Sequence, residues 1–334
     1  MPELTWRDSG RERTVIVRDG LLAEAPEVLG EQGWGDFELL STERAVADAP
    51  ALADAAARVH PVPAGPVPDA AAAVVDEVES DRIAALGGGR VIDSAKAVAA
   101  VRGAEVAAIP TTLSGAPMTG LHRMPVGHEG YGGVRPKLVL GDPAAMTSAP
   151  EPQLRASAMN ALAHGAESLY TPLADEISRS AALRGARMIA GALDREPSER
   201  DRSELALGAL LCGFAVDRSG FALHHVLGQT IVRVCGTPHA EAYAALLPVT
   251  MDAMRERAPE QIAKLAEALG TEPEAIGDRL AELAGGRRRL GELGAERACL
   301  EPALDAAMAR AELFQMTPGE LDRNDLRAIL EAAW

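Results

Sequence analysis

The chain has few of the features that mark disulfide-built, membrane-spanning or nucleic-acid-binding proteins. Its three cysteines, Cys212, Cys235 and Cys299, are far apart and odd in number, so we expect no disulfide framework and a reducing compartment. No apolar run is long enough to span a bilayer, and the charged N-terminus has no apolar signal-peptide core, which predicts a soluble, cytoplasmic protein. Lysine and arginine number 33 against 49 acidic residues, a net charge of −16, which argues against a broad nucleic-acid-binding surface.

Hydrophobic residues make up 47% of the 334 residues, which predicts a globular protein long enough for two domains. Up to about residue 150, short apolar runs alternate with segments of helical periodicity. We expect strands over 14–18, 37–41, 82–86, 105–109 and 137–141, helices over 21–29 and 91–101, and a loop over the proline-rich stretch 61–68. This alternation predicts a mostly parallel sheet with helices on both faces.

Beyond Pro150 and Pro152 the strand signals stop and helical periodicity continues to the C-terminus. The expected helices cover 154–170, 177–193, 205–216, 221–232, 262–268, 300–311 and 327–333. We therefore predict an α/β domain over residues 1–150 and an all-helical domain over residues 151–334.

Three adjacent glycines, Gly87, Gly88 and Gly89, link the strand over 82–86 to the helix over 91–101. Glycine lets the backbone turn tightly and approach a ligand, and the free N–H groups at the start of a helix attract phosphate. With Asp93 and Lys96 on the following helix, the turn favours dinucleotide binding by the first domain. A plain tight turn between strand and helix would use the same residues.

Hydroxyl side chains follow two strands at the same predicted edge of the sheet. Thr111, Thr112 and Ser114 come after the strand over 105–109, and Ser41 and Thr42 end the strand over 37–41. Ligands bind at the carboxyl edge of open parallel sheets, so we expect these residues to face a nucleotide cofactor. The pattern suits NADH and NADPH equally, and an ordinary capped loop would also explain the first three residues.

Three histidines and one amide form a second pattern. Asn160 and His164 are four residues apart and share one helix face, while His225 and His239 come from later elements. Such a set could bind Zn²⁺ or Fe²⁺, but Asn160 offers a neutral amide where such an ion prefers a carboxylate. The same spacing suits histidines that are hydrogen-bonded within a helical core.

These motifs, in this order, resemble the iron-containing (group III) alcohol dehydrogenase family from about residue 10 to the C-terminus. The matching segments are Gly87–Gly89 with Asp93 and Lys96, Pro110–Thr112, Asn160–Glu167, Leu223–His225, Pro238–Ala240 and Leu246–Pro248. The resemblance implies a dinucleotide-binding domain, a helical catalytic domain, a cleft between them, and NADH or NADPH as cofactor. It is closest to the maleylacetate reductase branch, which is similar at Leu40–Thr42, Ala116–Thr119 and Ala222–His225.

That branch has asparagine at the position of Asn160 and works without a metal, whereas other branches bind a metal through an aspartate there. The resemblance implies reduction of the C=C bond of maleylacetate to 3-oxoadipate, a step in aromatic-compound degradation, with Asn160, His164, His225 and His239 as catalytic residues and no metal. If a metal were bound, the three histidines would be its ligands. Hydrogen-bond donors would stabilise the enolate, and one histidine would deliver the proton.

The chain departs from that branch at Gln229, where a histidine that assists proton transfer is usual, and in the loop over 121–133. A dicarboxylate substrate needs a basic anchor, for which Arg123 is the candidate, while Arg233 is expected to be a surface charge. The further substrate candidates are His122, Tyr170 and Gln229.

Two other interpretations stay open at this stage. One is a metal-dependent alcohol or aldehyde dehydrogenase of the same family, and the other is a non-catalytic homologue that binds a nucleotide. We expect a homodimer, because symmetric dimers are the most frequent assembly, and no nucleic-acid or membrane partner.

Overall fold

The computed structural model describes residues 4–8, 13–130 and 132–334, so the first three residues of the charged N-terminus lie outside the described part. The chain divides into two compact units, Met1–Ala149 and Pro150–Trp334. Among the described residues, no single helix is long and apolar enough to cross a membrane, and the one pair of helices that passes by length and composition is bent by 100°.

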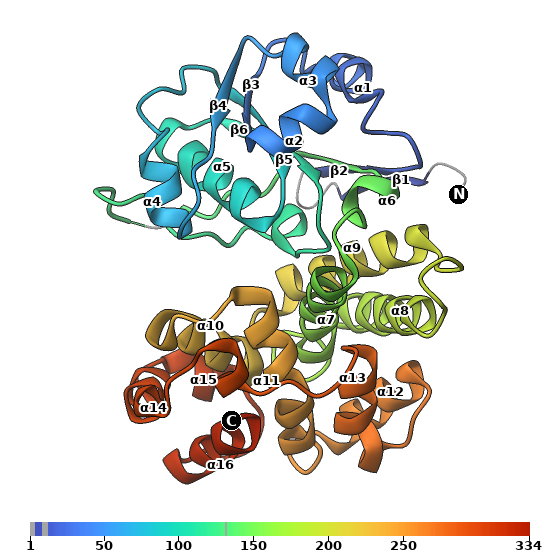
Figure 1. The fold of residues 1–334 in the computed structure, drawn as a ribbon, viewed down its shortest axis with the longest axis vertical. Coiled ribbons are helices and arrows are strands. Elements are labelled where there is room, and N and C mark those ends of the chain that lie inside the picture. The colour runs from blue at the N-terminus through green and yellow to red at the C-terminus, as the bar shows by residue number, and fades with distance from the viewer. Residues whose placement is uncertain (1–3, 9–12, 131) are drawn as a thin grey trace. The chain divides into compact units, whose positions relative to one another are not determined.

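The first unit contains a sheet of seven strands among its described residues (Figure 1). The strands are β1 Leu4–Asp8, β2 Arg13–Val17, β3 Glu38–Ser41, β4 Arg58–Pro61, β5 Arg82–Gly87, β6 Glu105–Pro110 and β7 Leu138–Gly141. Their order is β1-β2-β7-β6-β5-β3-β4, with β1 and β2 antiparallel and the other neighbours parallel. The carboxyl ends of β3, β5 and β6 therefore lie at one edge, where β5 leads into α5.

Helices cover both faces of this sheet. They are α1 Ala25–Glu31, α2 Glu43–Asp48, α3 Pro50–Ala55, α4 Val67–Ala72, α5 Gly89–Arg102, the 3₁₀ helix η1 Ala116–Met118, and α6 Pro143–Met146. Leu29 of α1 and Leu52 of α3 pack in one core with Leu39, Leu86 and Ile109 of the strands. Figure 1 shows α4 and α5 on the side of the sheet opposite α1 and α3.

Two predicted boundaries were wrong, each because of a proline. The helix expected from residue 21 begins at Ala25, since Pro26 occupies the first turn, where its missing N–H costs no hydrogen bond. The loop expected over 61–68 is shorter, because Pro61 ends the edge strand β4 and Pro68 lies in the first turn of α4.

The second unit is helical throughout its length (Figure 1). Its helices are α7 Glu151–Glu167, α8 Glu176–Leu193, α9 Arg202–Ser219, α10 Leu223–Cys235, α11 His239–Met254, α12 Pro259–Leu269, η2 Pro273–Ala275, α13 Ile276–Leu283, η3 Leu290–Leu293, η4 Arg297–Cys299, α14 Leu300–Met308, α15 Ala311–Met316 and α16 Arg323–Ala333. A mostly parallel sheet unit followed by a helical unit confirms the predicted fold class.

Small residues allow α7, α8 and α9 to pack closely. A Cβ atom added at Gly185 of α8 would lie 2.7 Å from the carbonyl oxygen of Gly208 and 2.7 Å from the Sγ of Cys212, both on α9. A Cβ atom added at Gly165 of α7 would lie 2.8 Å from the same sulfur. These backbones are therefore too close to admit any larger side chain at either glycine.

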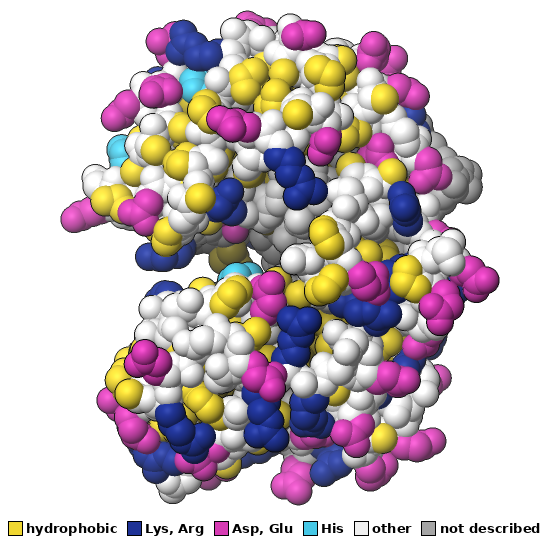
Figure 2. Space-filling view, viewed as in Figure 1, with side chains coloured by type: hydrophobic (Ala, Val, Ile, Leu, Met, Phe, Trp, Pro, Cys, Tyr) yellow, Lys and Arg dark blue, Asp and Glu magenta, His cyan; other side chains and the backbone are white. Residues whose placement is uncertain are grey.

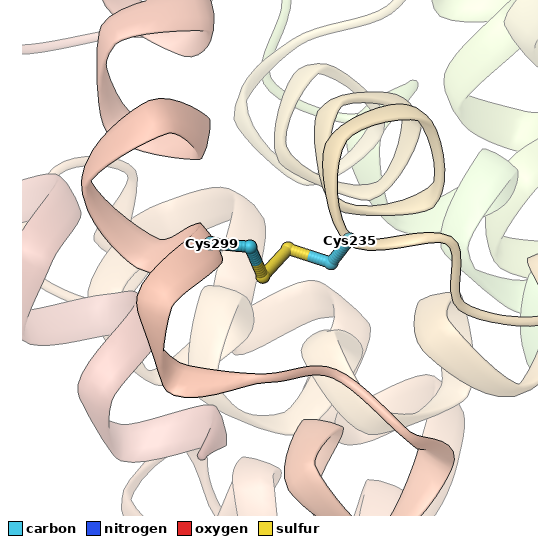
Figure 3. Close-up of a disulfide and its surroundings, with 2 residues drawn as sticks. All are labelled: Cys235 and Cys299. Carbon is cyan, nitrogen blue, oxygen red and sulfur yellow. A yellow bond between two sulfur atoms is a disulfide. The ribbon is translucent and has the colours of Figure 1, made fainter.

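The structure also changes the expectation that the cysteines form no disulfide. Cys235 at the end of α10 and Cys299 of η4 form a disulfide with a Cα–Cα distance of 5.6 Å (Figure 3). The prediction of no disulfide was wrong because the two residues are 64 apart in sequence, and only the packing of α10 on α14 brings them together. Cys212 is a free, buried thiol, and burial raises its pKa to about 12.

Charged side chains of both signs are interspersed over the face shown in Figure 2. Among the ion pairs of the described residues are Arg200 with Glu151 at 2.6 Å and Arg279 with Asp194 at 2.6 Å. This distribution agrees with an acidic protein that offers no extended basic stripe on that face.

Candidate functional site

The glycine turn after β5 requires glycine for two separate reasons. Gly87 has a φ of +156°, which side-chain-bearing residues rarely adopt, and a Cβ there would lie 2.8 Å from Cγ2 of Val91. Gly88 precedes α5 without a side-chain cap, so the first N–H groups of this 14-residue helix stay available to a ligand. Thr111 donates its N–H to the Gly87 carbonyl at 3.0 Å and holds the next loop against the turn.

The hydroxyl residues after β6 lie directly against these glycines. A Cβ at Gly88 would be 3.1 Å from Cγ2 of Thr112, and a Cβ at Gly89 would be 3.1 Å from Oγ of Ser114. Thr112 and Ser114 are both partly exposed. The structure thus brings the predicted turn and the predicted hydroxyl loop together at the carboxyl edge of the sheet, as phosphate binding requires.

Two of the predicted cofactor residues have structural contacts instead. Ser41 is fully buried and donates its hydroxyl to the Leu86 carbonyl at 2.8 Å, so it ties β3 to β5 and does not face a ribose. Thr42 caps α2 by accepting the N–H of Ala45 at 3.3 Å, which leaves its side chain partly exposed.

Lys96 is also fully buried, and its ammonium group lies 2.7 Å from Oδ1 of Asp93. The same group donates to the carbonyls of Ala116 at 3.1 Å, Thr119 at 3.0 Å and Leu121 at 2.7 Å. Lys96 and Asp93 therefore hold the segment around η1 in place, and the predicted direct contact of Lys96 with a cofactor is replaced by this supporting role.

The four predicted catalytic residues come together in the second unit. Asn160 and His164 lie one turn apart on α7, His225 lies near the start of α10, and His239 is the first residue of α11. The rings of His164 and His225 stack with centroids 4.6 Å apart, and the His239 ring packs on Tyr243 at 4.5 Å. The same Tyr243 ring meets the His225 ring edge-on at 5.1 Å, so Tyr243 lies between His239 and His225.

Three polar atoms in this cluster are buried without a hydrogen-bond partner among the described residues. They are Oδ1 of Asn160, Nδ1 of His164 and Nε2 of His225. A buried polar group without a partner costs about 1–3 kcal/mol, so such atoms are rare in a folded core. Three of them on neighbouring side chains indicate a site prepared for a polar ligand and not a set of satisfied structural histidines.

Burial sets the charge of the cluster. It lowers the pKa of His164 and His225 well below the usual range of imidazole, and neighbouring positive groups add to the effect. Burial also lowers the pKa of His224 to about 3. His164, His224 and His225 are therefore neutral at pH 7 in the free protein, and each can be an acceptor at one ring nitrogen and a donor at the other.

The cluster offers a metal ion imidazole nitrogens and an amide oxygen. The described residues contain no group of three or more His, Cys, Asp or Glu side chains placed to hold an ion. Asn160 adds a neutral oxygen where a carboxylate would be expected.

Glu167 belongs to the cluster, although the sequence pattern gave it no role. It lies on α7 three residues after His164 and is fully buried. Its carboxylate accepts hydrogen bonds from the backbone N–H of His224 at 2.7 Å and from the hydroxyl of Tyr170 at 3.3 Å, and it is hydrogen-bonded to Nδ1 of His225. Burial raises the pKa of Glu167, while the N–H donors of α10 lower it.

The weaker substrate candidates are dispersed. Gln229 is half-buried one turn after His225 on α10. His122 lies in the first unit, where its ring is hydrogen-bonded to the Gly132 carbonyl at 2.8 Å, and Arg123 beside it is exposed. Arg233 is exposed near the end of α10. Tyr170 is buried, and its hydroxyl donates a hydrogen bond to the Glu167 carboxylate. Its polar group therefore contacts this carboxylate and does not face a substrate.

The sheet unit with its glycine turn, followed by a helical unit with a histidine cluster, defines a class of two-unit oxidoreductases. A family model described as the iron-containing alcohol dehydrogenase matches residues 37–142, and the model of the C-terminal part of the same family matches residues 155–334. The chain belongs to the iron-containing alcohol dehydrogenase family.

Relatives named maleylacetate reductase are similar to most of the chain. Maleylacetate reductase 1 from Rhodococcus opacus is 33% identical over 283 residues, which cover 80% of this chain and 77% of the relative. Maleylacetate reductase from Rhizobium sp. (strain MTP-10005) is 31% identical over 345 residues, covering 96% and 95%. The crystal structure of maleylacetate reductase from Agrobacterium tumefaciens superposes with a TM-score of 0.86 at 29% identity, covering 100% of this chain and 98% of that one.

Proposed function

We propose that this oxidoreductase uses NADH or NADPH to reduce the C=C bond of maleylacetate, giving 3-oxoadipate, without a metal ion. The observation that carries the proposal is the set of side chains gathered in the helical unit, where the neutral amide of Asn160 accompanies His164, His225 and His239. The relatives named maleylacetate reductase support the substrate class. The glycine turn and hydroxyl loop of the first unit are the proposed cofactor-binding residues.

The substrate chemistry explains why such a site can act without a Lewis acid. The C=C bond of maleylacetate is conjugated to a ketone and a carboxylate, so it is already electrophilic. Hydride from the reduced nicotinamide adds to one carbon, and the electron pair of the double bond moves toward the ketone oxygen as an enolate. Hydrogen-bond donors stabilise that charge, and a proton added to the other carbon completes the reduction.

The helical unit supplies groups for both steps. The unpaired Nδ1 of His164 can donate a hydrogen bond to a substrate oxygen when it is protonated, the unpaired Oδ1 of Asn160 can accept one, and His225 presents Nε2 for the proton. A dianionic substrate beside these rings favours their protonated form, which opposes the lowering of the pKa by burial. Proton uptake thus accompanies substrate binding.

Arg310 is a further candidate for holding a substrate carboxylate. Its charge lowers the pKa of His225, so it lies within electrostatic reach of the cluster. It donates to Glu312 at 2.5 Å and is only partly exposed. Arg310 could not be assigned to the site from the sequence, because 85 residues separate it from His225 and no motif contains it.

The test is oxidation of NADH and NADPH with maleylacetate and with a panel of simple aldehydes, before and after dialysis against a chelator. We expect turnover with maleylacetate that chelation leaves unchanged. Preference for an aldehyde, with activity lost on chelation and restored by Zn²⁺ or Fe²⁺, would establish the metal-dependent alternative. Nucleotide binding without turnover of any compound would identify a non-catalytic homologue.

A further inference from the structure

The two oxygens of the buried Glu167 carboxylate have different partners. Oε1 accepts the backbone N–H of His224 at 2.7 Å and that of His225 at 3.4 Å, and it also accepts the Tyr170 hydroxyl at 3.3 Å. Oε2 is hydrogen-bonded to Nδ1 of the His225 ring. The contacts of Oε1 satisfy the first N–H groups of α10, a 13-residue helix, and a capping role explains them fully.

Capping does not explain the contact of Oε2. A carboxylate that accepts a hydrogen bond from Nδ1 places the proton on that nitrogen, so Nε2 of the neutral ring carries the lone pair. Nε2 of His225 is buried and has no partner among the described residues. The hydrogen bond therefore determines which ring nitrogen carries the free lone pair in the cluster of Asn160 and His164.

The neighbouring rings hold the imidazole of His225 in this orientation. Phe221 stacks on the ring at 4.5 Å and His164 stacks on it at 4.6 Å, while Tyr243 meets it edge-on at 5.1 Å. A ring flip would turn a carbon toward the carboxylate and leave Glu167 without its charge-assisted hydrogen bond. The orientation of the His225 ring and its tautomer are therefore fixed by the same set of contacts.

We propose that Glu167 is a positioning residue that holds His225 with Nδ1 protonated, so that the lone pair of Nε2 takes up a proton as the dianionic substrate binds, and the resulting imidazolium gives that proton from Nε2 to the substrate carbon. The proposal rests on the proposed reduction. Hydride leaves NADH or NADPH, which becomes oxidised, and the electron pair of the enolate forms the new C–H bond with the proton from Nε2. The electrons of the broken N–H bond remain on Nε2 as its lone pair, and Nδ1–H stays on Glu167.

The decisive variant is Glu167→Gln, with Tyr170→Phe as its matched control. A glutamine Oε1 still accepts the N–H groups of α10, but its amide NH₂ donates to Nδ1 and forces the His225 proton onto Nε2. Tyr170→Phe removes a different hydrogen bond from the same carboxylate and leaves the tautomer alone. Loss of tautomer control in a comparable carboxylate–histidine pair costs about 10⁴-fold in kcat.

We expect Glu167→Gln to lower kcat with maleylacetate by at least about 10²-fold, with KM changed by less than about threefold, while Tyr170→Phe stays within about threefold of the unaltered protein in both. Nitrogen-15 spectra of histidine-labelled protein should show the Nδ1–H tautomer of His225 in the unaltered protein and in Tyr170→Phe, and the Nε2–H tautomer in Glu167→Gln. Circular dichroism and NADH binding should match for all three proteins.

Wild-type kcat in Glu167→Gln, or an Nε2–H tautomer of His225 in the unaltered protein, would overturn the proposal. If Glu167→Gln does not fold, the tautomer in the unaltered protein and the kinetics of Tyr170→Phe decide the matter. The proposed function fails separately, by absence of maleylacetate turnover in the unaltered protein. In that case the reversal of the tautomer still tests whether Glu167 controls His225.

Discussion

The disulfide between Cys235 and Cys299 should supply a large part of the stability of the helical unit. A cross-link mainly restricts the unfolded chain, and its effect grows with the logarithm of the loop it closes. The bridged residues are 64 apart in sequence. For a loop of that length the chain-entropy relation gives about 14 cal/mol/K, or about 4 kcal/mol at 25 °C.

The perturbation is the double variant Cys235→Ala/Cys299→Ala, compared with the unaltered protein in the presence and absence of dithiothreitol. Urea unfolding followed by circular dichroism at 222 nm reports the helical unit, which contains most of the helix. We expect the reduced unaltered protein and the double variant to unfold at the same urea concentration, with a free energy of unfolding about 4 kcal/mol below that of the oxidised protein. Reductant should leave the double variant unchanged.

Thiol titration of the denatured protein supplies the control. Because Cys212 is the free cysteine, the oxidised protein should show one reactive thiol and the reduced protein three. Cys212→Ala changes stability through lost packing, so its response to reductant should equal that of the unaltered protein. Three thiols without any reductant, or equal stability with and without it, would refute the reasoning.

Two further predictions concern α8 and its neighbours. Asp175 caps α8 and pairs with Arg218 at 2.6 Å, and these contacts lower its pKa to about 2. A carboxyl with a lowered pKa stabilises the fold above its unfolded pKa of about 4, so Asp175→Asn should cost up to about 1 kcal/mol at pH 7, and urea unfolding should show this difference disappearing as the pH falls from about 4 to about 2. Gly185→Ala should cost about 1–3 kcal/mol because its Cβ would meet the carbonyl of Gly208, whereas Gly191→Ala on the same helix, which meets no described atom within 4 Å, should gain about 0.5–1 kcal/mol in thermal melts; equal effects would contradict the close packing.

The sheet was predictable because its central strands are short apolar runs bounded by glycine or proline. The missed elements include the long helix α11, which has Pro248 in its interior, and shorter elements without such a signal. The helices α2 and α3 have six residues each and are rich in alanine and charge, so they show no amphipathic period. The edge strand β4 has one buried residue in four, which leaves it without an apolar run.

In the candidate site, the residues that share a helix were predictable and their partners on other helices were not. Asn160 and His164 are four residues apart, so they lie on one face of α7 wherever this helix begins and ends. The bond between Glu167 and His225 spans 58 residues and depends on the packing of α7 against α10. The burial of Ser41 and Lys96 likewise follows from tertiary packing, which a local pattern of hydroxyl or basic residues does not contain.

The capped start of α10 also limits what the helical unit can bind. The N–H groups at the start of a helix often bind sulfate, phosphate or acetate from the buffer. Here the Glu167 carboxylate already accepts hydrogen bonds from these groups, and because it belongs to the same chain, its effective concentration exceeds that of any solute. Simple buffer anions should therefore inhibit weakly. A substrate with two negative ends has to turn both of them away from this end of the helix, which limits the orientations in which it can enter.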